Sequence, residues 1–250
     1  MTTRGSGLEE IGERLRGVIR TKDMRIAPDH HHYIVLSQLY SWMEKEAYVV
    51  AHGVMLDYGC GGQTYRKFFE AKIDKYIGAD VAIAADTELD IKLKPNQPVP
   101  LPDGSIDTVL AIQTLEHVPD PDFYLHESHR VLRPGGVLIV TAPMQWRHHE
   151  VPYDFFRFTK YGLIEILTRN GFEVVRIDSA GGVYSLLGQV FLDHLNERGI
   201  RLGFLFRCIN HLSLWLDRKI PDAEDTLNWM CIARRPAMLS GKPPKTEAWI

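Results

Sequence analysis

The sequence predicts an α/β protein built on a mostly parallel sheet that helices cover on both faces. Short apolar strands alternate with helical patterns from residue 54 to residue 177, an order typical of parallel sheets. A glycine turn, YGCGG at residues 58–62, directly follows the first of these strands. The composition, 45% hydrophobic and 24% charged over 250 residues, is that of an ordinary globular protein with one core.

The bulk properties argue against several classes of function. A formal net charge of -3 and a pI near 6.4 give no overall field that would hold nucleic acid. Cys60, Cys208 and Cys231 are an odd number without metal-like spacing, which indicates a reducing compartment. No apolar run is long enough for a signal peptide or a membrane span. We therefore expect a cytoplasmic protein that acts on small molecules.

One domain is expected over residues 1–250, with residues 1–50 as an N-terminal helical cover. Within that cover, residues 1–25 are charged and only weakly periodic. Apolar residues recur at helical spacing from Tyr33 to Tyr48, and His52-Gly53 ends this helix. The histidine run before it, residues 30–32, is interpreted as native surface.

The core elements follow with clear start and stop signals. Asp120-Pro121 supplies a helix N-cap and a first-turn proline, whereas Arg133-Pro-Gly-Gly136 ends that helix and turns the chain into the next strand. Thr159 caps a further helix, which Gly171 ends. The pattern predicts strands at Val54–Asp57, Tyr76–Asp80, Ile106–Gln113, Val137–Ala142, Phe172–Ile177 and Leu227–Arg234, helices at Gln63–Lys72 and Asp122–Leu132, and a loop at Thr87–Ile91.

Residues 183–220 form a long apolar helical region that precedes the last strand and is broken at residues 199–203. This helical insertion is a lid, a homodimer face, a surface for a lipid-linked substrate, or simple core packing. The tail from Pro236 is expected to fray.

The glycine turn is the first candidate binding site. Ligands of open parallel sheets sit beyond the carboxyl ends of the strands, and Gly59, Gly61 and Gly62 would let the main chain approach one closely. A dinucleotide fingerprint needs its last glycine where Thr64 stands, so that fingerprint fails. Asp57, placed by this reading at the mouth of the turn, would repel a diphosphate and attract a cation.

A second acid, Asp80, ends the next strand 23 residues after Asp57. This is close to the interval of about 20 residues at which an acid binds a ribose diol. Together the two acids favour a nucleoside with a positive portion and no phosphate, a description that S-adenosylmethionine fits. The alternative is that both acids are solvated strand ends.

Five motifs resemble, in order and spacing, the class I S-adenosylmethionine-dependent methyltransferases, in particular their type 11 group. They are LDYGCG (56–61), YIGAD (76–80), LPDGSIDTVL (101–110), LEHVPDP (115–121) and RVLRPGG (130–136). The resemblance covers about residues 50–178. It implies a Rossmann-like, mostly parallel seven-stranded sheet whose last strand, Leu227–Arg234, inserts antiparallel.

The resemblance also implies roles in cofactor binding. The residues are Asp57, Gly59, Cys60 and Gly61 around the methionine part, Asp80 on the ribose, Asp90 near the adenine with Asp86 as the alternative, and Gln113 beside the methionine part. The family often has a third glycine where this chain has Gln63. That glycine serves loop curvature and helix packing more than chemistry, so cofactor binding should survive its absence.

The candidate acceptor site is the stretch HHEVPYDFFRFT, residues 148–159, which follows the fifth strand at the same sheet edge. We expect His149 to be the general base with Asp154 orienting it, and Tyr153 and Arg157 to grip the acceptor. The alternative is a capped loop in which Asp154 pairs with Arg157 and the aromatic residues are core. The stretch resembles a signature of type 11 methyltransferases associated with cell-surface polysaccharide and glycolipid biosynthesis, which suggests a sugar or glycan hydroxyl as acceptor.

His117 is the rival base, because LEHV follows the fourth strand near the same pocket. With Glu116 it is similar to quinone-biosynthesis O-methyltransferases, which use an E-x-x-E-H cluster for a metal. Gln113 replaces the first acid of that cluster here, so no metal is expected.

Three functions stay open. The first is an O-methyltransferase acting on a glycan, oligosaccharide or other polar hydroxyl. The second is a methyltransferase of a natural-product, quinone or amine acceptor, favoured if Trp42, Trp146 and Phe155 line a closed apolar pocket. The third is a non-catalytic cofactor-binding protein, whose sign would be a loop over residues 150–159 that packs away from the cofactor cleft.

Overall fold

The computed structural model of the chain describes residues 26–81, 88–95, 97–222 and 224–237. The expected leader at residues 1–25 and most of the C-terminal tail lie outside these ranges. Among the described residues, no helix combines the length and the apolar composition needed to cross a bilayer.

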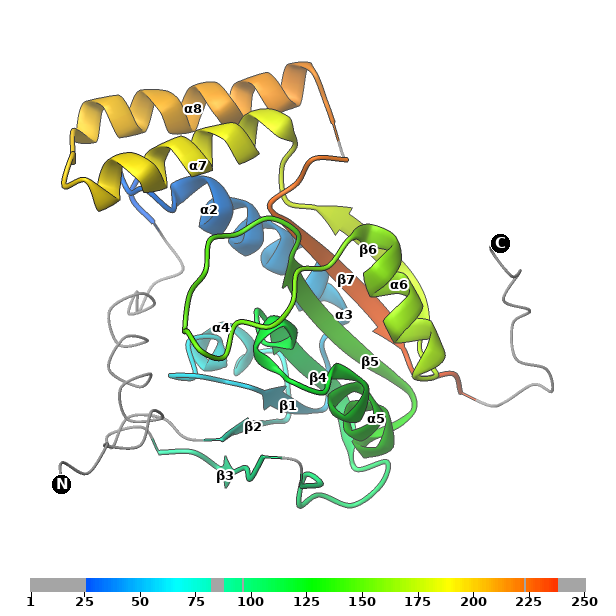
Figure 1. The fold of residues 1–250 in the computed structure, drawn as a ribbon. Coiled ribbons are helices and arrows are strands. Elements are labelled where there is room, and N and C mark those ends of the chain that lie inside the picture. Colours follow the sequence, from blue (N-terminus) through cyan, green and yellow to red (C-terminus); the bar gives the residue numbers. More distant parts are fainter. Residues whose placement is uncertain (1–25, 82–87, 96, 223, 238–250) are drawn as a thin grey trace, which may run out of the picture.

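Seven strands form one sheet in the order β3-β2-β1-β4-β5-β7-β6 (Figure 1). Strands β1 to β5 are parallel where they pair, and β7 runs antiparallel to both β5 and β6. The predicted fold class, including the antiparallel last strand, is therefore confirmed. The strands are β1 (Val54–Tyr58), β2 (Lys75–Asp80), β3 (Ile91–Lys92), β4 (Ile106–Ile112), β5 (Leu132–Pro143), β6 (Glu173–Ser179) and β7 (Asn228–Arg234).

Helices cover both faces of the sheet (Figure 1). On one face α5 and α6 bury Leu125 and Leu163, while on the other α2 and α4 bury Leu39 and Phe69. The helices are α2 (Tyr33–Trp42), continued by a π-helical turn (Met43–Ala47) and α3 (Tyr48–Val50), then α4 (Arg66–Phe69), the short 3₁₀ helix η2 (Leu115–His117), α5 (Pro121–Val131), α6 (Lys160–Arg169), α7 (Val183–Glu197) and α8 (Gly203–Lys219).

The predicted helix caps are confirmed. Asp120 accepts a hydrogen bond from the Phe123 N–H at 3.0 Å, and Thr159 accepts one from the Gly162 N–H at 3.0 Å. These bonds satisfy main-chain donors that have no partner within a helix. They start α5 and α6 where the sequence indicates, and these helices flank the loop that carries the candidate acceptor site.

Two predicted elements are wrong. The helix expected over Gln63–Lys72 is reduced to the four residues of α4, because Gln63 adopts a left-handed φ of +57° that no α-helix contains. Strand β5 begins at Leu132 and not at the predicted Val137, so residues 133–136 belong to it. Its pairing with β4 is irregular there, since Leu132 pairs with Ile106 and Val137 with Thr108, and the Gly135 N–H donates to the Arg235 carbonyl at 2.8 Å. The helix before these residues ends at Val131, as predicted to within one residue.

Strand β3 was not predicted, since only Ile91 and Lys92 form it, paired with the end of β2. Two residues are too few for a periodic pattern. Its pairing nevertheless brings the segment around Asp90 to the candidate cofactor edge.

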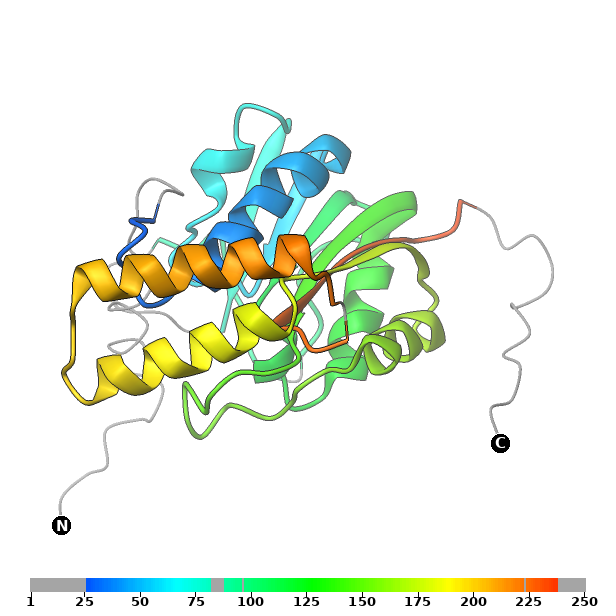
Figure 2. The same cartoon turned by 90° about the horizontal axis from the view of Figure 1, so that it is seen from above.

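The insertion forms a helical hairpin, α7 and α8, which stands above α2 (Figures 1 and 2). The break between its helices falls at residues 198–202, close to the predicted position. A Cβ on Gly188 would stand 2.2 Å from Ser213 Oγ, so the two helices approach closely at this glycine. A small apolar cluster that includes Ile34, Leu192 and Phe206 joins the hairpin to α2.

Candidate functional site

The glycine turn after β1 is held between the ends of two neighbouring strands. The Gly59 N–H donates to the Ala79 carbonyl at the end of β2, at 2.8 Å. Gly59 has a φ of +87°, and a Cβ there would stand 2.2 Å from Thr114 Cγ2, in the loop after β4. Only glycine satisfies both the backbone conformation and this close contact.

The outer side of the turn is bare. An ideal Cβ on Gly61 or on Gly62 would meet no atom within 4 Å. Asp80 bounds this space, because its carboxylate accepts hydrogen bonds from the Gly61 N–H at 2.8 Å and from the Val81 N–H at 2.6 Å. A ligand can therefore approach the main chain here, beside a carboxylate with remaining acceptor capacity.

Asp57 lies beneath the turn, so the prediction that it stands at the mouth is wrong. Its side chain is 1% exposed and accepts a hydrogen bond from the Tyr76 hydroxyl on β2. The strand alternation causes this, since it places Asp57 on the face that α4 covers. Burial raises the pKa of Asp57 to about 7, and the nearby charge of Asp80 adds to the rise.

The two acids share one face of the sheet. Asp57 is paired in register with Gly78, and Asp80 follows Gly78 by two residues on the same strand. Side chains two residues apart on a strand lie on the same face. Asp80 therefore forms an acidic wall beside the bare turn, and Asp57 adds negative charge beneath the turn once the pH exceeds its pKa of about 7. This charge favours a cation and disfavours a diphosphate.

Gln63 takes the backbone conformation that a glycine would otherwise supply. Its left-handed φ keeps the curvature of the turn, and Gly78 leaves room for its side chain, since a Cβ there would be 2.9 Å from Gln63 Cδ. The side-chain amide donates to the Glu88 carbonyl at 2.5 Å and accepts from Arg66 Nε at 2.6 Å. The structure thus agrees with the predicted role in curvature and adds a tie to the segment before β3.

The neighbouring Cys60 is buried, and burial together with the charges of Asp57 and Asp80 raises the pKa of its thiol. A thiol with a raised pKa is a poor nucleophile. Cys60 therefore contributes main chain to the turn and not a reactive group.

Asp90 lines an open hollow of about 510 Å³ beside Gln63 and Arg66. Its carboxylate accepts from the Gly78 N–H at 2.8 Å and pairs with Arg66. The adenine role of Asp90 stays a prediction, and its alternative, Asp86, lies outside the described residues.

Gln113 ends β4 on the other side of the turn with a left-handed φ of +51°. Its side chain donates to Thr141 Oγ1 on β5 at 2.9 Å. A non-glycine residue held in this region stores strain of the kind that accumulates at binding sites. Its contact with the methionine part of a cofactor stays a prediction.

The predicted acceptor loop is bonded to η2 and so lies against the cleft. The Phe155 N–H donates to the Glu116 carbonyl at 2.9 Å, and His117 Nδ1 lies 2.8 Å from the Tyr153 carbonyl. His117 also influences the pKa of Asp80, which burial raises and the His117 charge lowers. The loop and η2 are therefore bonded to each other and lie near Asp80 at the edge of the sheet.

Asp154 and Arg157 form a bidentate ion pair inside this loop, with N–O distances of 2.6 and 2.8 Å. The remaining N–H groups of Arg157 donate to the carbonyls of Trp146, Arg147 and Phe156. All five guanidinium donors therefore have partners within the loop. Burial alone would raise the pKa of Asp154, but the hydrogen bonds from Arg157 and from the His149 N–H hold that pKa below its usual range.

The two candidate bases lie side by side, with the rings of His117 and His149 4.6 Å apart. His149 Nδ1 lies 3.1 Å from the Arg147 carbonyl and 3.5 Å from the Asp154 carboxylate. In both histidines Nδ1 faces a main-chain carbonyl, which can only accept a hydrogen bond. The proton of each neutral ring is therefore assigned to Nδ1, and Nε2 is the basic atom. Burial and the neighbouring His117 lower the pKa of His149, so it is neutral near pH 7.

Two carboxylates that the sequence analysis did not assign to the site adjoin these histidines. Glu116 is fully buried, and neither of its carboxylate oxygens has a hydrogen-bond partner among the described residues. Burial raises its pKa to about 8. Glu150, at a φ of +52°, places its carboxylate 3.7 Å from His117 Nε2. Both stand in motifs named from the sequence, but their approach to the histidines depends on η2 and the loop, which come from two parts of the chain.

Ligand atoms of Glu116, His117 and His149 lie within 4.8 Å of one another, near enough for a metal ion. The expectation of no metal rested on Gln113, which bonds to Thr141 and is not part of this cluster. That expectation stays a prediction.

The aromatic residues named from the sequence do not form one pocket. Trp42 donates to Asp178 at 2.8 Å, Trp146 packs near the start of α2, and the side chain of Phe155 is 43% exposed. Phe158 is buried in the core, whereas Phe156 is exposed, so the capped-loop alternative, in which the aromatic residues of the loop are core, is correct for Phe158 and wrong for Phe156.

Residues 56–140 match the family model described as a methyltransferase domain, of type 11. Over these residues the chain is similar to a methyltransferase domain. S-adenosylmethionine is the cofactor of this domain, and the matched residues contain the glycine turn, both acids and η2.

Curated relatives agree with the methyltransferase domain. A probable S-adenosylmethionine-dependent methyltransferase of Mycolicibacterium smegmatis is 36% identical over 101 residues, which is 38% of this chain and 38% of that protein. A ubiquinone biosynthesis O-methyltransferase of Ruegeria pomeroyi is 25% identical over 193 residues, 73% of each chain. The chain spans only 17–40% of the length of several other curated relatives that it matches.

Among solved structures, the [4+2]-cyclase SpnF shares the fold with a TM-score of 0.55 and 22% identity, covering 81% of this chain and 83% of that one. At this identity the likeness concerns the fold alone.

The residues at the methyltransferase domain's cleft fit the cofactor. The space outside Gly61 and Gly62 admits a ligand against main chain, and Asp57 and Asp80 supply negative charge where an ammonium and a sulfonium would be stabilised. Asp80 would hold the ribose, as the sequence predicts, and Asp57 would act through its charge from below the turn.

Replacing Asp57 by asparagine should change how stability depends on pH. Because the pKa of Asp57 is about 7 in the folded protein and near its ordinary value when unfolded, the folded state binds one more proton between these values. Stability contributed by Asp57 is therefore lost as the pH rises through this window. The free energy of unfolding of Asp57→Asn, relative to wild type, should rise by up to about 1.4 kcal/mol per pH unit.

Urea unfolding at about pH 5 and about pH 7.5 measures this difference. Asp74→Asn, which removes an exposed carboxylate next to β2, is the control and should show no such trend. A difference for Asp57→Asn that does not vary with pH would contradict the buried position of the acid.

Proposed function

We propose that the protein is an S-adenosylmethionine-dependent O-methyltransferase whose acceptor is a hydroxyl of a sugar, glycan or glycolipid. The observation that supports this is the pair His117 and His149, two oriented imidazoles on a polar loop bonded to the edge of the cofactor cleft. A hydroxyl acceptor must lose a proton during attack, and a neutral imidazole can accept it.

When bound, S-adenosylmethionine supplies a methyl group already activated on a sulfonium. The chain then has to hold the acceptor oxygen in line, which corresponds to effective molarities of about 10⁵ M or more. The hydrogen bonds between η2 and the loop fix the histidines relative to the glycine turn. A positioned base adds a further factor of about 10²–10⁴.

We assign His149 as the base, with Nε2 taking the proton. The Arg147 carbonyl, 3.1 Å from Nδ1, orients the ring, and Asp154 holds the residue by accepting from its main-chain N–H at 3.2 Å. Arg157 then acts as a positioning residue, because its donors hold Asp154 and three loop carbonyls. Tyr153 remains the proposed acceptor-binding residue. His117 contacts only its main-chain carbonyl, so this contact does not occupy the Tyr153 side chain.

The surface around the histidines suits a polar acceptor with an accessible end. Glu150 and His148 provide hydrogen-bonding groups, and the exposed rings of Phe155 and Phe156 provide flat apolar edges. A sugar presents both hydroxyls and apolar C–H faces. A closed apolar pocket lined by Trp42, Trp146 and Phe155, which would favour a small aromatic acceptor, is not formed by these residues.

A hydroquinone hydroxyl is the second candidate acceptor. The observation in its favour is the likeness to ubiquinone biosynthesis O-methyltransferases from several bacteria. Fold likeness does not decide between acceptors, because a cyclase shares this fold as well.

The hairpin suggests how a lipid-linked acceptor would reach the site. Its surface exposes apolar side chains next to basic residues that form no ion pair with any other described residue, a combination that suits an anionic lipid headgroup. The exposed residues are Leu187, Val190, Phe191, Phe204, Leu212 and Trp215, with Arg198, Arg207 and Lys219 among them. A homodimer through this face stays a prediction of the sequence analysis.

Incubating the protein with S-adenosylmethionine and separate pools of sugar nucleotides, oligosaccharides, glycolipids and hydroquinones should show a gain of one methyl mass in a carbohydrate pool. Mass spectrometry detects the product, and Asp80→Ala, expected to weaken cofactor binding first, is the background control. Methylation of the hydroquinones alone would establish the second candidate. Cofactor binding without methylation of any pool would favour a non-catalytic role.

His149→Ala should keep cofactor affinity but lower kcat by about 10²- to 10⁴-fold, because it removes the base and not the cofactor cleft. His126→Ala is the matched control, since it removes an exposed histidine on α5 that has no assigned role in the site. Turnover is measured on the acceptor found in the screen. Wild-type turnover in His149→Ala, together with a loss in His117→Ala, would move the base to His117.

A further inference from the structure

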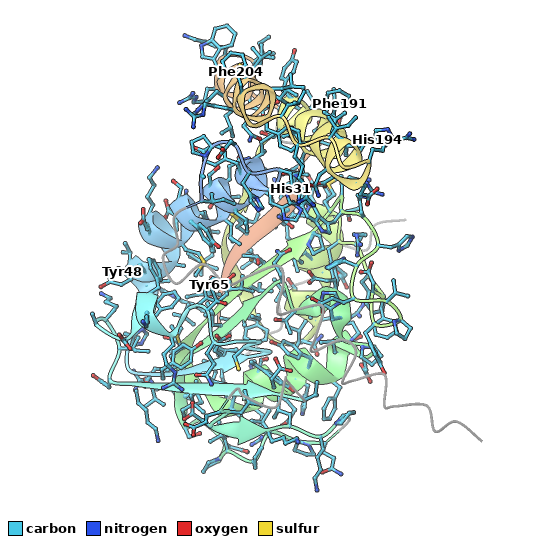
Figure 3. The ribbon with its side chains drawn as sticks, turned by 90° about the vertical axis from the view of Figure 1, so that its left-hand side faces the viewer. His31, Tyr48, Tyr65, Phe191, His194 and Phe204 are labelled. Atoms are coloured by element: carbon cyan, nitrogen blue, oxygen red, sulfur yellow. The ribbon has the colours of Figure 1, made fainter. Side chains whose placement is uncertain are left out.

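The histidine run at residues 30–32 takes no part in the methyltransferase site. The structure places it at the start of α2, beneath the α7–α8 hairpin, where His31 is visible in Figure 3. His31 and His32 are half-buried, and they lie close to Asp193 of α7. The ligand atoms of these three residues lie within 4.8 Å of one another.

The three histidine rings are packed together. The ring centroids of His31 and His32 are 3.9 Å apart, and those of His30 and His31 are 4.4 Å apart. His32 Nε2 lies 3.4 Å from Asp193 Oδ1. A single His–Asp ion pair accounts for His32 but not for His31, because two adjacent protonated imidazoles would repel each other.

Gln189, fully buried one turn before Asp193 on α7, organises the group. Its side-chain nitrogen donates to Asp193 Oδ1 at 2.9 Å and to the His31 carbonyl at 2.9 Å. Its side-chain oxygen has no hydrogen-bond partner among the described residues. This oxygen of the amide group that binds Asp193 is a buried acceptor available to a water molecule, including one bound to a metal ion.

We propose that His31, His32 and Asp193 bind a first-row divalent transition-metal ion, with Zn²⁺ as the ion that this ligand set fits best. Two imidazole nitrogens and one carboxylate oxygen are common Zn²⁺ ligands, and three protein ligands leave a fourth position for water. Gln189 is the outer residue that orients the Asp193 carboxylate. His30 supports the His31 ring by stacking and lies outside the ligand set.

The ion would have a structural role. It joins the start of α2 to α7, two elements that also meet through a small apolar cluster and through hydrogen bonds of Gln189 and Gln38. The ring of His32 lies 5.3 Å from that of Trp146, in the loop whose carbonyl groups hold Arg157. Metal binding should therefore stabilise the hairpin and the acceptor loop together, because an ion that binds the folded state only raises its stability.

The test uses the full chain, treated with chelator and titrated with Zn²⁺ by calorimetry, with bound metal counted by elemental analysis. Wild type should bind one ion per chain at this site. Loss of a residue that only supports a metal ligand typically weakens metal binding by about 10- to 100-fold. His32→Ala and Asp193→Asn each remove a ligand, so each should weaken Zn²⁺ binding by more than this. His194→Ala is the matched control, since it removes an exposed histidine next to Asp193 on the same helix, and should bind as wild type.

A thermal shift provides the second readout, with circular dichroism confirming that each variant folds. Zn²⁺ should raise the Tm of wild type and of His194→Ala but not that of Asp193→Asn. His117→Ala separates this site from the cluster beside the acceptor loop and should keep the shift. Binding that is unchanged in Asp193→Asn, binding lost in His117→Ala instead, or no Zn²⁺ binding by the wild type would overturn the proposal.

Discussion

The account depends on the placement of two carboxylates on one face of the sheet, beside main chain that no side chain covers. Asp57 and Asp80 end neighbouring parallel strands, and their register brings them together. The bare turn next to them is open at Gly61 and Gly62. Negative charge on the floor and wall of such a cleft attracts a cationic nucleoside and repels a diphosphate. The methyltransferase domain matched over residues 56–140 is consistent with this preference.

A second constraint positions the chemistry. The acceptor loop is held by the guanidinium of Arg157 from within and by the carbonyl of Glu116 from η2. The left-handed residues Gln63, Gln113 and Glu150 all border the same cleft. Backbone strain of this kind persists where surrounding contacts over-determine it. The contacts around the cleft thus hold these three residues in left-handed backbone conformations. The hydrogen bonds of the loop hold the rings of His117 and His149 in defined orientations.

Most of the fold followed from the sequence, because alternating strands and helices with caps at Asp120 and Thr159 leave few topologies. The failures have local causes. Gln63 adopts a conformation that helical periodicity does not reveal, and the glycines at 135–136 pair with the end of β7, a contact distant in sequence. At the site, Asp80, His117 and His149 could be named from motifs. The burial of Asp57 and the approach of Glu116 and Glu150 to the histidines depend on tertiary packing, which no motif encodes.

The most direct measurement is isothermal titration calorimetry of the full chain with S-adenosylmethionine, S-adenosylhomocysteine and NAD, on wild type and on Asp80→Asn. The account predicts that wild type binds S-adenosylmethionine, that NAD does not compete with it, and that Asp80→Asn loses affinity for the nucleoside. Binding of NAD in place of S-adenosylmethionine, or affinity for S-adenosylmethionine that Asp80→Asn leaves unchanged, would contradict it.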